Sequence, residues 1–292
     1  MFRAAAIYGV DFSGARLAGR TTWLARIEPS PGGEGDVDAV PYRLTMLARL
    51  ESLAGTAERA AALGHLTGRI RASGPGALWA LDFPFGFPVE VLGPREGAER
   101  WADQFRFLER FGEDGYAAGL ECLRRARALG GAGHIRRATD TESRAPFDPY
   151  HYRIIYQTFF GMRDVLGPLR ADFPETALLP FHADAPTAET RRVLVEACPS
   201  STLKRLGLPH HNYKQPAAKA PDARRRATRR VILAGLSGHV RIGRRRRAIL
   251  MRDPGGDALD AVIAAVGAAQ AWSSAPETDP HPRHALEGRH YC

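Results

Sequence analysis

Five acidic residues stand where predicted strands end or a predicted helix begins. Asp11 follows an apolar run, Asp82 follows another, and Glu196 lies near the end of a third. Asp257 and Asp260 are spaced i and i+3 in an Ala-rich segment, so they project from the same face of a helix. If the strands share one sheet and the helix packs across it, these carboxylates meet at one place.

Clustered carboxylates repel one another, which raises their pKa values unless a cation is present. Mg²⁺ and Mn²⁺ prefer oxygen ligands, and such ions can activate a water and stabilise the leaving oxygen of a phosphodiester. We therefore predict a Mg²⁺ or Mn²⁺ site with Asp11, Asp82, Asp257 and Asp260 as ligands. We also predict that Glu196 belongs to the catalytic set.

Each acid also has a simpler interpretation. Asp257 can be an N-cap with Asp260 in the favourable first turn. Asp11 and Asp82 can bond to the backbone of their own turns, and Glu196 can be a surface acid at a strand end. The joint placement of all five at element ends favours a shared site over these separate explanations.

The elements that must position these acids follow from the apolar periodicity. Five segments are predicted strands: 4–11, 21–28, 40–50, 77–83 and 191–200. Three segments are predicted helices: 56–73, capped by Thr56, 221–236 and 257–272. A turn or loop is expected at 32–36, and Gly14 is expected to allow a tight reversal into the second strand.

The predicted fold is α/β, a mixed five-stranded sheet flanked by helices with a large, mostly helical insertion. The first three strands have short connections typical of antiparallel hairpins, and the helix at 56–73 allows a parallel crossover to the fourth. The core is assigned to 1–88 and 191–272, the helical and loop insertion to 89–190, and an irregular tail to 273–292.

The charge is distributed unevenly. The chain of 292 residues carries +9, but residues 203–252 alone hold fifteen Lys/Arg and one acid, Asp222. This asymmetry favours nucleic acid as a partner, although an Arg-rich chain can also use arginines on solvated helix faces. We predict phosphate contacts from Lys214, Lys219 and Arg224, and from the further Arg clusters 225–226, 229–230 and 244–247.

The polar and aromatic stretch 136–153 in the insertion is a candidate substrate-covering segment. Bases can stack on Phe147, Tyr150 or Tyr152, or these rings can be buried against the helices of the insertion. No run approaches the roughly 18 apolar residues of a membrane span, so no membrane partner is expected. The three widely spaced cysteines fit a reducing, cytoplasmic environment.

Four segments together resemble a known family: "GVDFSGA", "ALDFPFGFP", "VEACPSSTLKRLG" and "GGDALDAVIAA". They are similar to the bacterial and archaeal domain of unknown function 429, described as predicted RNase H-like nucleases. "DALDA" (257–261) also resembles the D-x-x-D-A opening of the last helix in RuvC-type resolvases. The resemblance covers both ends of the chain, about two thirds of it, and leaves 89–190 less well assigned.

The resemblance implies an RNase H-like fold and a role for each acid. Asp11 matches the first-strand acid, and Asp82 matches the fourth-strand acid, where the resolvases usually have Glu. Asp257 and Asp260 match the two last-helix acids. Glu196 lies in the family's own E-x-x-P pattern, which nucleases of known activity do not share, so its role stays open.

Three function classes remain after this reasoning. The first is a metal-dependent nuclease or phosphodiesterase acting on DNA or RNA. The second is a nucleotide-dependent phosphotransferase of the actin and sugar-kinase type, which "VDFSGA" imitates, although a second Gly-rich phosphate loop is missing from the sequence. The third is a nucleic-acid-binding module that has lost catalysis. Oligomeric state does not follow from the sequence.

Overall fold

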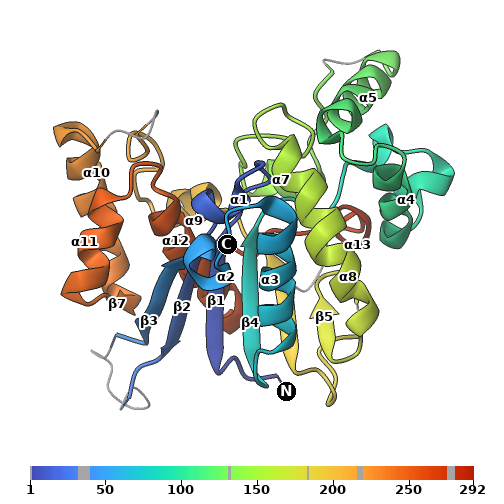
Figure 1. The fold of residues 1–292 in the computed structure, drawn as a ribbon. Helices are drawn as coiled ribbons and strands as arrows, with labels where there is room; N and C mark the ends of the chain where they lie inside the picture. The colour runs from blue at the N-terminus through green and yellow to red at the C-terminus, as the bar shows by residue number, and fades with distance from the viewer. Residues whose placement is uncertain (1, 32–39, 131–132, 183, 216–219, 275–279) are drawn as a thin grey trace.

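A mixed seven-stranded sheet forms the centre of the computed structural model (Figure 1), with strand order β5-β6-β4-β1-β2-β3-β7. The structure describes residues 2–31, 40–130, 133–182, 184–215, 220–274 and 280–292. The predicted turn at 32–36 lies outside these residues. The strands are β1 (Ala6–Asp11), β2 (Trp23–Pro29), β3 (Tyr42–Arg49), β4 (Ala77–Asp82), β5 (Thr176–Leu178), β6 (Arg192–Glu196) and β7 (Val240–Arg241).

The prediction of five strands was wrong, since β5 and β7 extend the sheet at its two edges. They contain three and two residues, which is too short for an alternating pattern to be recognised. β5 also lies within the segment 89–190, for which a mostly helical and loop structure was expected. The other five strands fall within the predicted ranges, apart from one residue at the end of β2.

The sheet combines a parallel half and an antiparallel half. β1 is parallel to β4 and antiparallel to β2, and β2 is antiparallel to β3. β4, β6 and β5 continue in parallel, as do β3 and β7. In the β1–β4 pair, Asp11 is in register with Asp82, so the strand ends place these two residues side by side.

Helices cover both faces of the sheet (Figure 1). The longer helices are α3 (Arg59–Arg71), α5 (Gly115–Ala128), α10 (Ala223–Gly235), α11 (Arg244–Arg252) and α12 (Asp257–Ser273). The shorter helices are α1 (Ala18–Thr21), α2 (Leu50–Ala54), α4 (Gln104–Glu109), α6 (Ala138–Glu142), α7 (Ile155–Phe160), α8 (Gly167–Leu169), α9 (Pro199–Arg205) and α13 (His284–Glu287).

Alternate side chains of each strand point to opposite faces of the sheet and pack into two separate hydrophobic cores. On β4, Trp79 and Leu81 pack with α3 and with insertion residues such as Phe159. Leu78 and Ala80 point to the opposite face and join the apolar residues of α12. The sheet is therefore buried on both sides, which agrees with its near-continuous apolar strands.

Two predictions about the ends of elements required correction. α3 begins at Arg59 and its cap is Glu58, whose carboxylate accepts hydrogen bonds from the N–H groups of Ala60 and Ala61; Thr56 is not the cap. β6 ends at Glu196, and Pro199 is the first residue of α9, a position that suits the fixed φ of proline.

The turn at Gly14 also differs from the prediction. The short helix α1 separates it from β2, so the chain does not reverse tightly there. A Cβ at Gly14 would lie 2.0 Å from the carbonyl oxygen of Tyr156. The glycine is needed because the insertion packs directly against this backbone.

The end of the chain, expected to be irregular, is ordered against the core. α13 is followed by a parallel bridge between His290 and Glu196 of β6. The Glu287 carboxylate accepts hydrogen bonds from the N–H groups of Val89 and Ala138. The tail therefore fastens the insertion to the sheet.

Candidate functional site

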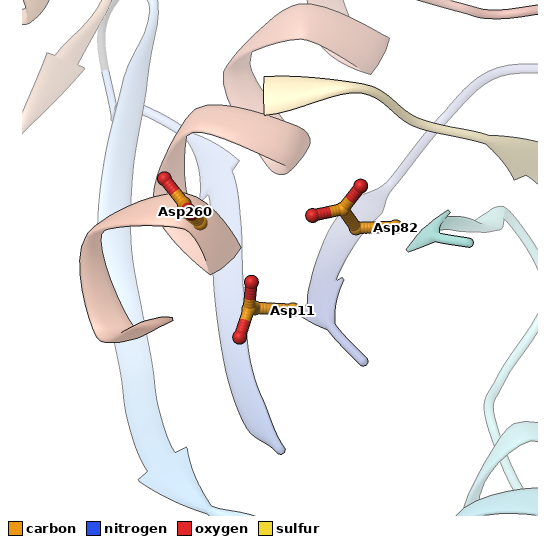
Figure 2. Close-up of side chains that lie close together, drawn as sticks. All are labelled: Asp11, Asp82 and Asp260. Atoms are coloured by element: carbon orange, nitrogen blue, oxygen red, sulfur yellow. The ribbon is translucent and has the colours of Figure 1, made fainter. Parts of the chain in front are cut away.

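Three carboxylates meet beside the carboxyl ends of β1 and β4 (Figure 2). Asp11 ends β1, Asp82 ends the adjacent parallel strand β4, and Asp260 comes from the first turn of α12. One oxygen from each residue lies within 4.8 Å of the others. We call Asp11, Asp82 and Asp260 the acidic trio.

The close approach of α12 to β1 brings Asp260 to the strand ends. A Cβ at Gly9 would lie 2.0 Å from the carbonyl oxygen of Ala261 and 2.6 Å from the backbone nitrogen of Ala265. Only glycine allows this contact between helix backbone and strand. Gly9 precedes Asp11 by two residues, so it fixes the helix beside the carboxylate that the strand carries.

Burial and repulsion by neighbouring carboxylates disfavour the charged forms of Asp11 and Asp82. Burial raises the pKa of Asp11 well above its usual range, and the charge of Asp257 adds to this shift. Burial, followed by the charge of Asp260, raises the pKa of Asp82 to about 8. Within the described residues, the positive charge near Asp11 and Asp82 is therefore too little to offset the burial and repulsion of their ionised forms.

Lys214 and Tyr213 supply partial compensation to Asp260. The Lys214 ammonium forms an ion pair with Oδ2 of Asp260, and the Tyr213 hydroxyl donates a hydrogen bond of 2.8 Å to Oδ1. Burial opposes the charge of Lys214, but the carboxylates of Asp260 and Asp11 raise its pKa. The Lys214 side chain as a whole remains 51% exposed, although its ammonium is paired with Asp260.

The donor set suits a hard divalent cation. The trio offers carboxylate oxygens only, which Mg²⁺ and Mn²⁺ prefer over nitrogen or sulfur. A bound cation would also remove the repulsion that raises the pKa values of Asp11 and Asp82. The chemistry of these residues thus fits a metal ion without selecting between Mg²⁺ and Mn²⁺.

Asp257 lies next to the trio but is not a member of it. Among the described residues, the carboxylates that gather within 4.8 Å are those of Asp11, Asp82 and Asp260. Asp257 is the first residue of α12, and burial raises its pKa to about 6. The side chain that accepts a hydrogen bond at this helix start is Asp253, from the Ala258 N–H.

Glu196 is a fully buried partner of Arg137. Two Arg137 nitrogens donate to its two carboxylate oxygens, the Phe85 N–H donates to Oε2, and His290 lies 2.9 Å from Oε1. Burial opposes its charge, but Arg137 and His290 lower the pKa of Glu196 to about 2. Its oxygens are occupied, so the structure gives Glu196 a role in holding the insertion to the sheet.

The acidic trio opens into a cavity of about 560 Å³. Cationic or titratable nitrogen groups line much of its wall, and several come from segments far from the trio in sequence. These groups are Arg137, Arg153, Lys204, His210, His211, Lys214, Arg225 and His290. Asp140 and Glu196 also line the cavity, where they pair with Arg137. The other lysine and arginine side chains of the wall, beside the carboxylate trio, suit an anionic ligand held by a metal ion.

The predicted phosphate-binding residues differ in their positions relative to the cavity. Lys214 lines the cavity, Lys219 lies outside the described residues, and Arg224 is exposed on α10 and does not line the cavity. Its neighbour Arg225 does line it, and also donates a hydrogen bond of 2.7 Å to the Lys214 carbonyl.

Arg229, predicted within a phosphate-binding cluster, is fully buried. Its guanidinium donates to the carbonyls of Tyr213, Leu250, Asp253 and Pro254. Arg229 thereby joins the Tyr213–Lys214 segment to the loop before α12. Because it is buried and bonded to these carbonyls, it cannot contact a phosphate.

Sequence reasoning missed Arg137, Tyr213 and His290. Arg137 lies in the polar stretch 136–153 and pairs across 59 residues with Glu196. Tyr213 reaches Asp260 across 47 residues. No local pattern indicates such contacts, although the adjacency of Tyr213 to Lys214 was a usable signal.

Comparisons with protein-family models, with curated proteins and with solved structures found no match to this chain. Among the described residues, no helix combines the length and apolar character needed to cross a membrane. The fold and the site must therefore carry any functional conclusion by themselves.

Proposed function

We propose that this protein is a divalent-metal-dependent phosphodiesterase of RNase H-like fold that acts on nucleic acid. The observation that carries the proposal is the acidic trio, three carboxylates gathered at the ends of two adjacent parallel strands and a packed helix. Structural ion pairs explain isolated buried acids. They do not explain the trio. Within the described part of the chain, Asp260 is the one member with an ion pair, and its partner is the half-exposed Lys214.

The arrangement of the elements supports the RNase H-like part of the proposal. β1, β2 and β3 form an antiparallel meander, α3 crosses over, and β4 returns parallel to β1. α12 then packs on β1 and carries Asp260. This is the order of strands, helix and closing acidic helix that the sequence resemblance implies.

The proposed chemistry divides the work between metal and protein. Asp11, Asp82 and Asp260 would hold the ion, which when bound lowers the pKa of a water and stabilises negative charge on the phosphoryl group. Tyr213 orients the Asp260 carboxylate through its hydrogen bond. Lys214 and the basic groups of the cavity wall attract and position the phosphate.

Cleavage of nucleic acid tests the proposal. The purified protein is incubated with single-stranded, duplex and branched DNA and with RNA, in Mn²⁺, in Mg²⁺ and in chelator. We expect cleavage in a divalent ion only, and its loss in Asp11→Asn and Asp260→Asn by about 10³-fold. Asp114→Asn is a matched control, because Asp114 is an exposed helix cap and Asn caps equally well.

Other outcomes would replace the proposal. Metal-independent cleavage, or cleavage unchanged in Asp11→Asn, would contradict it. A protein that is stabilised by nucleotides and cleaves nothing would fit the phosphotransferase alternative. Nucleic-acid binding that persists in chelator without any cleavage would fit a non-catalytic binding module.

A further inference from the structure

Three rings of the insertion form a continuous aromatic series beside the acidic cavity. Phe147 and His151 stack with ring centroids 4.4 Å apart, and His151 and Tyr152 lie 4.5 Å apart. The Arg153 guanidinium lies 5.6 Å from the Phe147 ring and 5.8 Å from the Tyr152 ring. We call Phe147, His151, Tyr152 and Arg153 the aromatic track.

The aromatic track joins two hollows of the molecule. Phe147 and Arg153 line the cavity of the acidic trio. At the other end Tyr152 lines a second hollow of about 210 Å³, whose wall includes the exposed side chains of Tyr116 and Leu120. A ligand that lies along the track therefore enters the acidic cavity at one end and the second hollow at the other.

Two rings at the second hollow are exposed to solvent. Tyr152 is 63% exposed and Tyr116 is 47% exposed, so neither ring stabilises the core fully. Tyr150 differs, because it is buried and its hydroxyl bonds to the backbone of Gly133 and Ile135. Among the rings predicted for base stacking, Phe147, Tyr150 and Tyr152, Tyr150 is therefore buried and structural, whereas Tyr152 is accessible to a ligand.

The charge along the track favours a polyanion. Between residues 143 and 157, Asp148 is the one acidic residue, and it is buried against His134. Arg153 is exposed beside the rings, and Arg136 is exposed nearby in sequence. The exposed Tyr152 ring, backed by the half-buried rings of His151 and Phe147 and placed beside Arg153, is the kind of surface that an unpaired base and its phosphate recognise.

We propose that the aromatic track binds single-stranded nucleic acid and leads it into the cavity of the acidic trio. A base stacks on the exposed ring of Tyr152, His151 and Phe147 continue the stack, and Arg153 contacts the backbone. A duplex cannot use this surface, because its bases are already stacked on each other. The inference rests on the proposed function, since it names the substrate class for that same site.

The test measures binding in chelator, so that no cleavage is required. Fluorescent single-stranded DNA and RNA of about twelve nucleotides are titrated by anisotropy against a hairpin duplex of equal charge. We expect the single strands to bind more tightly than the duplex. Tyr152→Ala weakens single-strand binding roughly 5- to 150-fold, the range that loss of one base stack produces.

Two further variants separate stacking from other contacts. Tyr152→Phe keeps the ring and should bind as the unchanged protein does, whereas Tyr152→Leu keeps apolar bulk without the ring and should bind weakly. Phe173→Ala is the matched control, because Phe173 is also exposed, at 43%, and lines neither hollow. Since Tyr152 is exposed, all three Tyr152 variants should melt within a few degrees of the unchanged protein.

Several results would overturn the inference. They are equal binding of duplex and single strand, unchanged binding in Tyr152→Ala, or full binding in Tyr152→Leu. Self-association lost in Tyr152→Ala, without any oligonucleotide binding, would instead make the track a contact between copies of the chain. Asp11→Asn separates this inference from the proposed function, because it should lose cleavage and still bind single strands.

Discussion

Replacing Asp82 by asparagine should stabilise the metal-free protein in a way that depends on pH. Burial and the charge of Asp260 raise the pKa of Asp82 to about 8, whereas an unfolded aspartate titrates near 3.9. Between about pH 4 and pH 8, folding therefore takes up a proton at this residue. Because the folded state binds more protons, this contribution to stability falls as the pH rises through that window.

The magnitude follows from the same two pKa values. From pH 5 to pH 7 the contribution of Asp82 to the free energy of unfolding falls by up to about 2.7 kcal/mol, at 1.36 kcal/mol for each pH unit. The asparagine side chain does not titrate, so Asp82→Asn should gain about 2 kcal/mol relative to the unchanged protein over this interval. Comparing two pH values cancels the constant cost of burying an amide in place of a carboxyl group.

Urea unfolding in chelator, at pH 5 and at pH 7, measures this difference. Added Mn²⁺ should stabilise the unchanged protein more than the variant, because the variant lacks one carboxylate ligand of the trio. A stability difference between Asp82→Asn and the unchanged protein that is the same at both pH values would refute the reasoning. So would a variant that gains as much stability from Mn²⁺ as the protein with Asp82.

Three further changes have defined outcomes. Gly9→Ala should lower the free energy of unfolding in urea by at least about 1–3 kcal/mol, because its Cβ would lie 2.0 Å from the Ala261 carbonyl oxygen. The control is Gly64→Ala, whose Cβ would meet open space on α3, and it should be neutral or stabilising by up to about 1 kcal/mol. Arg137→Met should cost about 3–5 kcal/mol in the same assay, since it leaves Glu196 buried without its partner. The lowered pKa of Glu196, about 2, should make its stabilisation disappear as the pH falls from about 4.5 to 2, which acid unfolding of Glu196→Gln against the unchanged protein measures.

The positions of Asp11 and Asp82 could be predicted because each ends an apolar strand. Parallel pairing of those strands then places them in register. Asp257 and Asp260 were both predicted as ligands because they lie on the same helix face, and the sequence could not show that Asp260 would lie within 4.8 Å of Asp11 and Asp82. This proximity depends on how α12 is rotated over β1, and the backbone contact at Gly9 sets that rotation only in the folded protein.

The role of Glu196 could not be predicted, because its partner is distant in sequence. A carboxylate at a strand end looks the same whether it faces a ligand or a buried arginine. Only the fold brings Arg137 and His290 to it. Likewise, the arginines of 203–252 look alike in sequence, but Arg229 is buried as a structural support while Arg225 lines the cavity.

The central claim is that the acidic trio holds a divalent cation, and Mn²⁺ binding tests it most directly. Titration calorimetry or electron paramagnetic resonance of the purified protein should show bound Mn²⁺. We expect Asp11→Asn, Asp82→Asn and Asp260→Asn each to weaken that binding at least about tenfold, and Asp114→Asn to leave it unchanged. Absence of Mn²⁺ binding, or equal binding by the three trio variants and the control, would contradict the account.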